Sequence, residues 1–283
     1  MGIDRHTVSV VIPTLGRDTI KSCREALSRQ TRPPDEIIIV MDKDRRGPSW
    51  ARNEGIRSSR GDLIAFTDDD CIPPRDWLEC LIRAIDLHDA AGAGGTFEET
   101  DPLLRAKRLR RGFPTAEQID TTGWVGNAGN LMYRRNGLEA CIERDGYVFD
   151  ESFDAFSGED IDLVWRLRRG GAKLIFVPNP VIHLRRVKPL EYFAHQLDRG
   201  KGIALLFLAH RSANDPVKPQ KSLLWGKASH GKGRKWLDVF LHKTIGPFDA
   251  RSFSGWKDFV VFWIGEKCEG TGFLLQILNR WRP

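Results

Sequence analysis

Short apolar runs alternate with amphipathic stretches along the first hundred residues, and this alternation constrains the fold more than any other feature of the chain. The runs at 8–12, 36–41 and 62–67 are rich in β-branched residues and predict buried strands. The stretches between and after them have the spacing and the terminal residues of helices. These helices are expected at 18–30, capped by Asp18, at 48–58, with Pro48 in the first turn, and at 74–88. Such alternation predicts parallel βαβ units in an open sheet.

The alternation is interrupted once and then resumes. From residue 98 to 120 charged residues dominate, with a basic stretch at 105–111, and no regular element is expected there. The remaining predicted elements are strands at 91–96, 130–134 and 173–177 and helices from 136 and over 159–169. Beyond Pro189 the chain turns helical, then basic and rich in tryptophan. We therefore expect an α/β domain over 1–188 and a helical, basic and aromatic extension over 189–283.

Composition bears on partners and compartment. The chain has 44 Lys and Arg against 38 Asp and Glu, a formal charge of +6, which suits an anionic ligand or membrane surface. Its 5 cysteines are scattered without a C-x-x-C pair, so neither a disulfide framework nor a zinc site is indicated. Because we find no hydrophobic leader and no run of roughly 18 apolar residues, we expect a cytoplasmic protein, with peripheral binding to the inner face of the cell membrane as an option.

Three consecutive aspartates, Asp68, Asp69 and Asp70, follow the third predicted strand. Ligands of open parallel sheets bind at the carboxyl ends of the strands. Adjacent carboxylates repel one another, and Mg²⁺ or Mn²⁺, which prefer oxygen ligands, would relieve that repulsion. A solvated loop, in which Asp70 caps the next helix, explains the run about equally well at this point.

A second acidic group stands at the start of the predicted helix 159–169. From there Asp160 could accept a proton from an attacking hydroxyl. Ser157 and Asp160 also fit the S-x-x-[DE] capping box, and the spacing alone slightly favours that structural role.

Five short motifs occur in a fixed order: VSVVIPT at 8–14, EIIIVMD at 36–42, ARNEG at 51–55, GDLIAFTDDD at 61–70 and GEDID at 158–162. Arranged in this way, residues 7–185 resemble the family 2 glycosyltransferases of the GT-A fold. The resemblance implies an α/β fold with a mainly parallel open sheet flanked by helices. A nucleotide and metal half, about 7–97, would precede an acceptor half, about 98–188. It also implies inverting transfer from a nucleoside-diphosphate sugar, with UDP as the expected nucleotide and Mn²⁺ or Mg²⁺ as the cofactor.

The resemblance also carries roles to individual residues. Asp160 matches the general base and Asp70 the metal ligand, while Asp68 would face the ribose or the water shell of the metal. The other donor-binding residues that it implies are Pro13, Thr14, Asp42 at the nucleotide base, Arg52 and Asp69. For Arg52, an exposed helix arginine that is simply solvated is the alternative.

Three further features have both a functional and a structural interpretation. His183 is implied as an additional metal or diphosphate ligand, although a lone histidine is more often structural. Arg185 and Arg186 could bind the diphosphate as bidentate donors or lie solvated at the surface. The stretch 126–130 resembles the family's turn near the sugar and acceptor, and an ordinary turn explains it as well.

The expected acceptor is a saccharide or lipid-linked hydroxyl, in the synthesis of a cell-surface polysaccharide, glycolipid or related glycoconjugate. The basic segments at 105–111 and 230–235, with the late tryptophans, suggest contact with anionic lipid head groups. A solvated charged face over a small aromatic core is the alternative.

Two other classes of protein were weighed. A metal-dependent nucleotidyltransferase also presents carboxylates to a nucleotide, but residues 13–17 contain a single glycine where such an enzyme has a glycine-rich phosphate loop. A basic nucleic-acid-binding protein would explain the net charge, but not an acidic cluster at a strand end, which repels phosphate. No nucleic-acid partner is therefore expected.

Overall fold

The computed structural model describes residues 6–111, 114–119, 125–153, 158–210 and 256–280. The chain divides into two compact units. We call Met1–Glu98, Phe113–Ser152 and Glu159–Leu184 the sheet unit. We call Glu99–Gly112, Phe153–Gly158 and Arg185–Pro283 the helical unit.

A seven-stranded sheet forms the centre of the sheet unit, in the order β2-β1-β3-β8-β5-β9-β7. Its strands are β1 (Val8–Thr14), β2 (Glu36–Met41), β3 (Leu63–Phe66), β5 (Gly92–Gly94), β7 (Gln118–Ile119), β8 (Leu131–Arg134) and β9 (Leu174–Phe176). Strand β1 runs parallel to β2 and β3, and β5 runs parallel to β9. The expected α/β fold is confirmed, and the sheet is mixed because β8 lies antiparallel between β3 and β5 and β7 lies antiparallel to β9. A smaller sheet has the order β4-β10-β6, formed by β4 (Cys71–Ile72), β10 (Val181–His183) and β6 (Phe97–Glu99).

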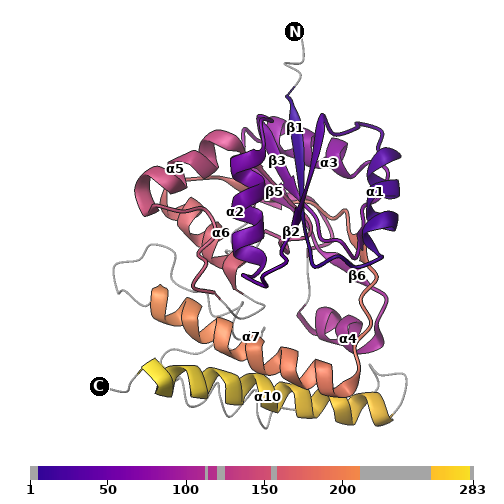
Figure 1. Cartoon of the computed structure of the whole chain (residues 1–283), viewed down its shortest axis with the longest axis vertical. Helices are drawn as coiled ribbons and strands as arrows, with labels where there is room; N and C mark the ends of the chain where they lie inside the picture. The colour runs from indigo at the N-terminus through magenta and orange to yellow at the C-terminus, as the bar shows by residue number, and fades with distance from the viewer. Residues whose placement is uncertain (1–5, 112–113, 120–124, 154–157, 211–255, 281–283) are drawn as a thin grey trace. The chain divides into compact units, whose positions relative to one another are not determined.

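Helices cover both faces of the large sheet (Figure 1). They are α1 (Ile20–Ser28), α2 (Pro48–Ser58), α3 (Trp77–Leu87), α5 (Arg135–Asp145) and α6 (Glu159–Arg169). Helices α1 and α3 lie on one face and α2, α5 and α6 on the other (Figure 1). Because side chains alternate along a strand, Val8, Val10 and Ile12 of β1 join the buried core with α1 and α3.

The opposite face of β1 receives α2 at unusually short range. A Cβ atom added to Gly55 of α2 would lie 2.2 Å from Cγ1 of Val11, so only glycine permits this approach. The close packing of α2 on β1 brings Arg52, one turn earlier on α2, toward the carboxyl end of the sheet.

Two local expectations are corrected by the structure. Residues 36–41 were expected to form a buried strand, but β2 is an edge strand, and Ile37, Ile39 and Met41 are 39–44% exposed. The first helix begins at Ile20 with Thr19 at its N-cap, and Asp18 is solvent-exposed rather than a cap. The strand and the helix both form where the local pattern predicts them. The exposure of β2 depends on its place at the edge of the sheet, which the local pattern does not contain.

The helical unit contains a helix that was not expected. Residues 98–120 were predicted to lack regular structure, yet α4 (Pro102–Arg111) occupies much of this segment. Helix α4 packs with α7 (Pro189–Ala209) and α10 (Trp256–Arg280). Two basic residues of α4 have acidic partners: Nζ of Lys107 lies 3.1 Å from Glu266, and Arg108 pairs with Glu99 at 2.5 Å. The partner of Arg108 lies only nine residues away, but that of Lys107 lies in α10, far along the sequence, so the charge pattern of the segment alone concealed the helix.

The expectation of membrane contact rested in part on the basic segments 105–111 and 230–235, of which the structure describes only the first. Lys107 and Arg108 are engaged within the helical unit, whereas the segment 230–235 lies outside the described residues. Among the helices that the structure describes, none has the length and apolar character needed to cross a bilayer.

Candidate active site

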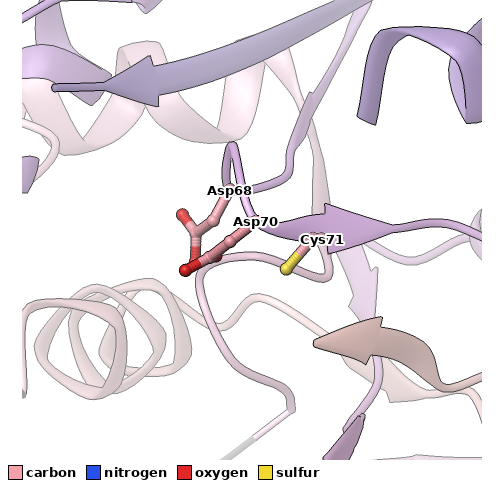
Figure 2. A group of neighbouring side chains, drawn as sticks. All are labelled: Asp68, Asp70 and Cys71. Atoms are coloured by element: carbon pink, nitrogen blue, oxygen red, sulfur yellow. The ribbon is translucent and has the colours of Figure 1, made fainter. Parts of the chain in front are cut away.

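The run of three aspartates lies directly after β3, at the carboxyl end of the parallel strands β1, β2 and β3. Carboxylate oxygens of Asp68 and Asp70 and the sulfur of Cys71 lie within 4.8 Å of one another. Figure 2 shows the two carboxyl groups side by side, with Cys71 at the start of β4. The helix that follows begins at Trp77 with Asp76 at its N-cap, so Asp70 does not cap it.

Asp69, the middle aspartate, is buried and fixes the end of β1. Its Oδ2 accepts a hydrogen bond of 2.5 Å from the hydroxyl of Thr14, and its Oδ1 accepts one of 3.1 Å from Arg17. Burial raises the pKa of Asp69, while the bonds from Thr14 and Arg17 oppose that rise. The hydroxyl of Thr14 in turn accepts a bond from the backbone N–H of Gly16. Of the predicted site residues at the end of β1, Thr14 is thereby tied to the aspartate run, and Pro13 precedes it on the same strand.

Asp70 is surrounded by basic and polar groups. Nη1 of Arg17 lies 2.8 Å from its Oδ2, and Nε2 of His183 lies 3.5 Å from its Oδ1. His183 reaches this position because β10 pairs antiparallel with β4, which places His183 opposite Cys71. The structure therefore brings the predicted ligands Asp68, Asp70 and His183 into one neighbourhood, although His183 follows the two aspartates by more than a hundred residues.

Arg52 is buried, which excludes the alternative of an exposed, solvated arginine. Its Nη2 donates to Oδ1 of Asp68 at 3.0 Å, and its Nη1 donates to Oε1 of Glu159 at 2.9 Å. Burial lowers the pKa of Arg52, but the carboxylates of Asp68, Glu159 and Asp160 outweigh this effect and raise it overall. Arg52 therefore stays charged and joins the aspartate run to the start of α6.

Asp160 lies in the first turn of α6 and is held by backbone donors. Its Oδ1 accepts from the N–H of Ile161 at 2.8 Å, and its Oδ2 accepts from the N–H of Ala128 at 3.2 Å. Burial raises the pKa of Asp160, which makes its carboxylate a stronger base. Ser157, the other member of the possible capping box, lies outside the described residues.

The turn at 126–130 connects the two acidic groups. Ala128 donates to Asp160, and the neighbouring Gly129 packs against Asp68: an added Cβ would lie 2.7 Å from Oδ2 of Asp68. Asp68 and Asp160 thus flank two consecutive residues of one turn. The sequence left this stretch open between an ordinary turn and a turn near the sugar and acceptor; it lies beside Asp68 and Asp160, and its nearness to sugar and acceptor stays a prediction.

Asp42 was predicted to contact the nucleotide base, and the structure shows that its carboxylate also holds a backbone turn. Its two carboxylate oxygens accept from the backbone N–H groups of Arg46 and Gly47, at 2.9 and 2.8 Å. These bonds close the turn that leads from β2 into α2. The contact with the base stays a prediction, and any such contact has to share the carboxylate with this turn.

The donor set fits a divalent cation of the Mg²⁺ or Mn²⁺ type. Asp68 and Asp70 supply two neighbouring carboxylates, the oxygen ligands that these ions prefer. Burial, reinforced by Asp68 and Asp70, raises the pKa of the Cys71 thiol well above its ordinary value. The protonated thiol is a poor ligand, so the carboxylates and His183 are the better candidates.

Sequence reasoning missed two members of this network. Glu159 lies next to the predicted base Asp160 in the sequence, but no role was predicted for it. Its partner Arg52 is 107 residues away. Arg17 follows β1 and was noted only as part of a loop with a single glycine. The other predicted diphosphate donors, Arg185 and Arg186, belong to the helical unit, where Arg185 contacts His195.

Comparison with known proteins bears directly on this part of the chain. Residues 41–141, which include Asp42, Arg52 and the aspartate run, match the sequence profile described as "Glycosyl transferase family 2". The resemblance to the family 2 glycosyltransferases is confirmed. The profile assigns no role to single residues and covers neither Asp160 nor His183, so the roles of all the predicted site residues stay predictions.

Individual relatives of this chain are distant in sequence. A "Pre-mycofactocin glycosyltransferase" of Mycobacterium tuberculosis (strain ATCC 25618 / H37Rv) is 28% identical over 193 residues, 64% of this chain and 39% of that protein. The "Glycosyltransferase AglE" of Haloferax volcanii is 29% identical over 236 residues, 72% of this chain and 75% of that protein. The chain therefore spans about two fifths of the mycobacterial relative, 39% of its length.

A solved structure supports the fold assignment. A crystal structure described as GalNAc-T7 with UDP, GalNAc and Mn²⁺ has a TM-score of 0.51 with this chain at 15% sequence identity. The match covers 73% of this chain and 48% of that protein. At this level of identity the likeness concerns the fold, which is of the GT-A type in both proteins.

Proposed function

We propose that this chain transfers a sugar from a nucleoside-diphosphate donor, with UDP as the expected nucleotide, to an acceptor hydroxyl with inversion at the anomeric carbon. One observation carries the proposal: the carboxylate pair Asp68 and Asp70 and the carboxylate of Asp160 flank the same turn, through Gly129 and Ala128. A donor bound at Asp68 and Asp70 would then lie on the same turn as the proposed base, which supports their acting on one substrate pair.

The chain's own residues divide the work of this reaction. Asp160 takes the proton of the acceptor hydroxyl, whose oxygen bonds to the anomeric carbon as the bond to the diphosphate oxygen breaks. The electron pair of that bond leaves with the diphosphate. Asp68 and Asp70, with His183 beside them, would hold Mn²⁺ or Mg²⁺, which when bound neutralises charge on the diphosphate.

For the acceptor and the cellular location, we propose only a general class. A saccharide or lipid-linked hydroxyl, in the synthesis of a cell-surface glycoconjugate, is in keeping with glycosyltransferase relatives from bacteria and archaea. Binding to an anionic membrane surface is the less supported part, because Lys107 and Arg108 already have acidic partners. Flotation with anionic liposomes tests it, and the absence of salt-sensitive binding would exclude it.

Calorimetry with nucleoside diphosphates tests the central proposal. The solved structure of similar fold contains UDP, GalNAc and Mn²⁺, which makes these the first ligands to try. We expect UDP to bind in the presence of Mn²⁺ and to bind much more weakly in the presence of a chelator. A wild-type protein that binds no nucleoside diphosphate with either Mn²⁺ or Mg²⁺ would contradict the proposal. A following screen of UDP-sugars by thermal shift would identify the sugar.

A further inference from the structure

The ion pair of Arg52 and Glu159 is a feature that neither the metal site nor the base explains. The guanidinium lies 2.9 Å from the carboxylate, and the two side chains are only 5% and 9% exposed. The same guanidinium contacts Asp68 at 3.0 Å. A chain of charges therefore runs from Glu159 through Arg52 to Asp68.

This arrangement is a poor way to stabilise a fold. Burying two charges removes them from water, and apolar side chains of similar size often serve stability as well or better. The pair is also incompletely satisfied: within the part of the chain that the structure describes, Nε of Arg52 and Oε2 of Glu159 are buried without a hydrogen-bond partner. Such groups call for an explanation beyond packing.

The position of Asp68 supplies the explanation. Arg52 holds Oδ1 of Asp68, while Gly129 packs against Oδ2. Held from both sides, the carboxylate keeps one orientation relative to Asp70. Arg52 can do this only if its own guanidinium is fixed, and its other hydrogen-bonded ion-pair partner is Glu159.

We propose that Glu159 is a positioning residue: it anchors the buried guanidinium of Arg52, and Arg52 in turn orients the carboxylate of Asp68 for the donor diphosphate and its cation. This inference rests on the proposed function and deepens it. Glu159 acts through Arg52 and is assigned no contact with substrate. It also ties the aspartate run to the first turn of α6, where the next residue is Asp160.

Substitution of Glu159 separates this role from general stability. We expect E159A to weaken Mn²⁺-dependent UDP binding by about 10–100-fold, the usual effect of removing a group that orients a metal ligand. E159Q keeps an oxygen that can accept from Arg52, so it should restore most of the lost affinity. In turnover, the KM for the donor should rise more than kcat falls, because Asp160 retains both of its backbone donors.

The control is a matched ion pair on the same helix. Asp162 and Arg166 of α6 are 2.7 Å apart and only 3% and 5% exposed, and the described contacts of this pair do not include the aspartate run. D162N and E159A should both lower the melting temperature, but D162N should leave the UDP affinity of the folded protein unchanged.

The outcomes are distinguishable. Wild-type-like UDP affinity in E159A, or an equal loss in E159A and D162N, would overturn the positioning role and leave the proposed function intact. A loss in E159A that E159Q does not relieve would also overturn it, because the anchor would then not depend on an acceptor for Arg52. Absence of UDP binding by the wild type would remove the proposed function, and this inference with it.

Discussion

Among single residues, Asp160 has the most specific expected role. Asn at this position keeps an oxygen that can accept from Ala128 or Ile161 but cannot take up a proton. We expect D160N to bind UDP and Mn²⁺ like the wild type and to lose sugar transfer by about 10²–10⁴-fold, the usual contribution of a general base. Initial rates and calorimetry measure the two properties. A variant with normal turnover would exclude Asp160 as the base.

Substitution of Asp70 is expected to impair binding of UDP and the metal rather than the proton transfer. D70A removes one of the two carboxylates of the candidate cation site and also one of the two carboxylate partners of Arg17. Binding of UDP should fall by at least about tenfold in the presence of Mn²⁺ and lose its dependence on the metal. Asp76, at the N-cap of α3, provides the control, because D76N changes an aspartate outside the cluster of Asp68 and Asp70. Undiminished metal-dependent binding in D70A would contradict the metal assignment.

The raised pKa of Glu159 predicts that the stability of the fold depends on pH. Burial, and then the nearby Asp160, raise the pKa of Glu159 from its ordinary value of 4.5 to about 7. Between these values the folded state binds more protons than the unfolded state, so the contribution of Glu159 to the unfolding free energy falls as the pH rises. Relative to E159Q, the wild type should therefore lose stability between about pH 5 and about pH 8. Urea denaturation at both values tests this, and parallel behaviour of the two proteins would contradict it.

At the scale of the elements, the contact of α2 with β1 determines where Arg52 lies. A methyl group at Gly55 would collide with Val11, so α2 has to move or strain. We expect G55A to cost about 1–3 kcal/mol of unfolding free energy, as overpacked cores do. It should also weaken UDP binding, because Arg52 moves with the helix. Urea denaturation and calorimetry measure these effects.

Gly137 of α5 offers the matched control for this substitution. A Cβ atom there would lie 3.8 Å from its nearest neighbour, the side chain of Ala91, which is ordinary contact. G137A should therefore be neutral or stabilising by up to about 1 kcal/mol, since alanine favours a helix over glycine. Equal destabilisation by G55A and G137A would show that the close contact of α2 with β1 is not the cause.

At the scale of the whole molecule, the helical unit depends on contacts between segments far apart in sequence. Helices α7 and α10 approach closely because glycines face backbone: an added Cβ at Gly200 or Gly272 would lie 1.9 Å from a carbonyl oxygen of the other helix. Lys107 of α4 reaches Glu266 and Glu269 of α10. The three helices are thus joined by close packing and by one buried charge cluster.

Removal of the Lys107 ammonium tests that cluster. K107M removes the ammonium that both buried carboxylates share and leaves Glu269 with Arg199, at 3.3 Å; the loss should cost the helical unit about 3–5 kcal/mol. Hydrogen exchange of the amides in α4, α7 and α10 measures the loss. The control is K201M, because Lys201 and Asp198 are more than 30% exposed and such pairs contribute little. Equal protection in wild type and K107M would contradict a stabilising role for the cluster.

The sequence by itself determined the α/β class, the extent of most strands and helices, and the place of the aspartate run after β3. These features have a period of two or of 3.6 residues or depend on neighbouring residues, so they can be read locally. The five ordered motifs also pointed to the family that the comparisons confirm.

Only the tertiary structure decided which side chains meet. Arg52 joined Asp68 to Glu159, His183 came beside Asp70 through the pairing of β10 with β4, and Asp42 was drawn into a turn. The helix α4 remained hidden because the acidic partners of Lys107 lie in α10, some 160 residues later. The physical reason is the same in each case: an ion pair depends on distance in space and on burial, and the order of residues along the chain specifies neither until the chain has folded.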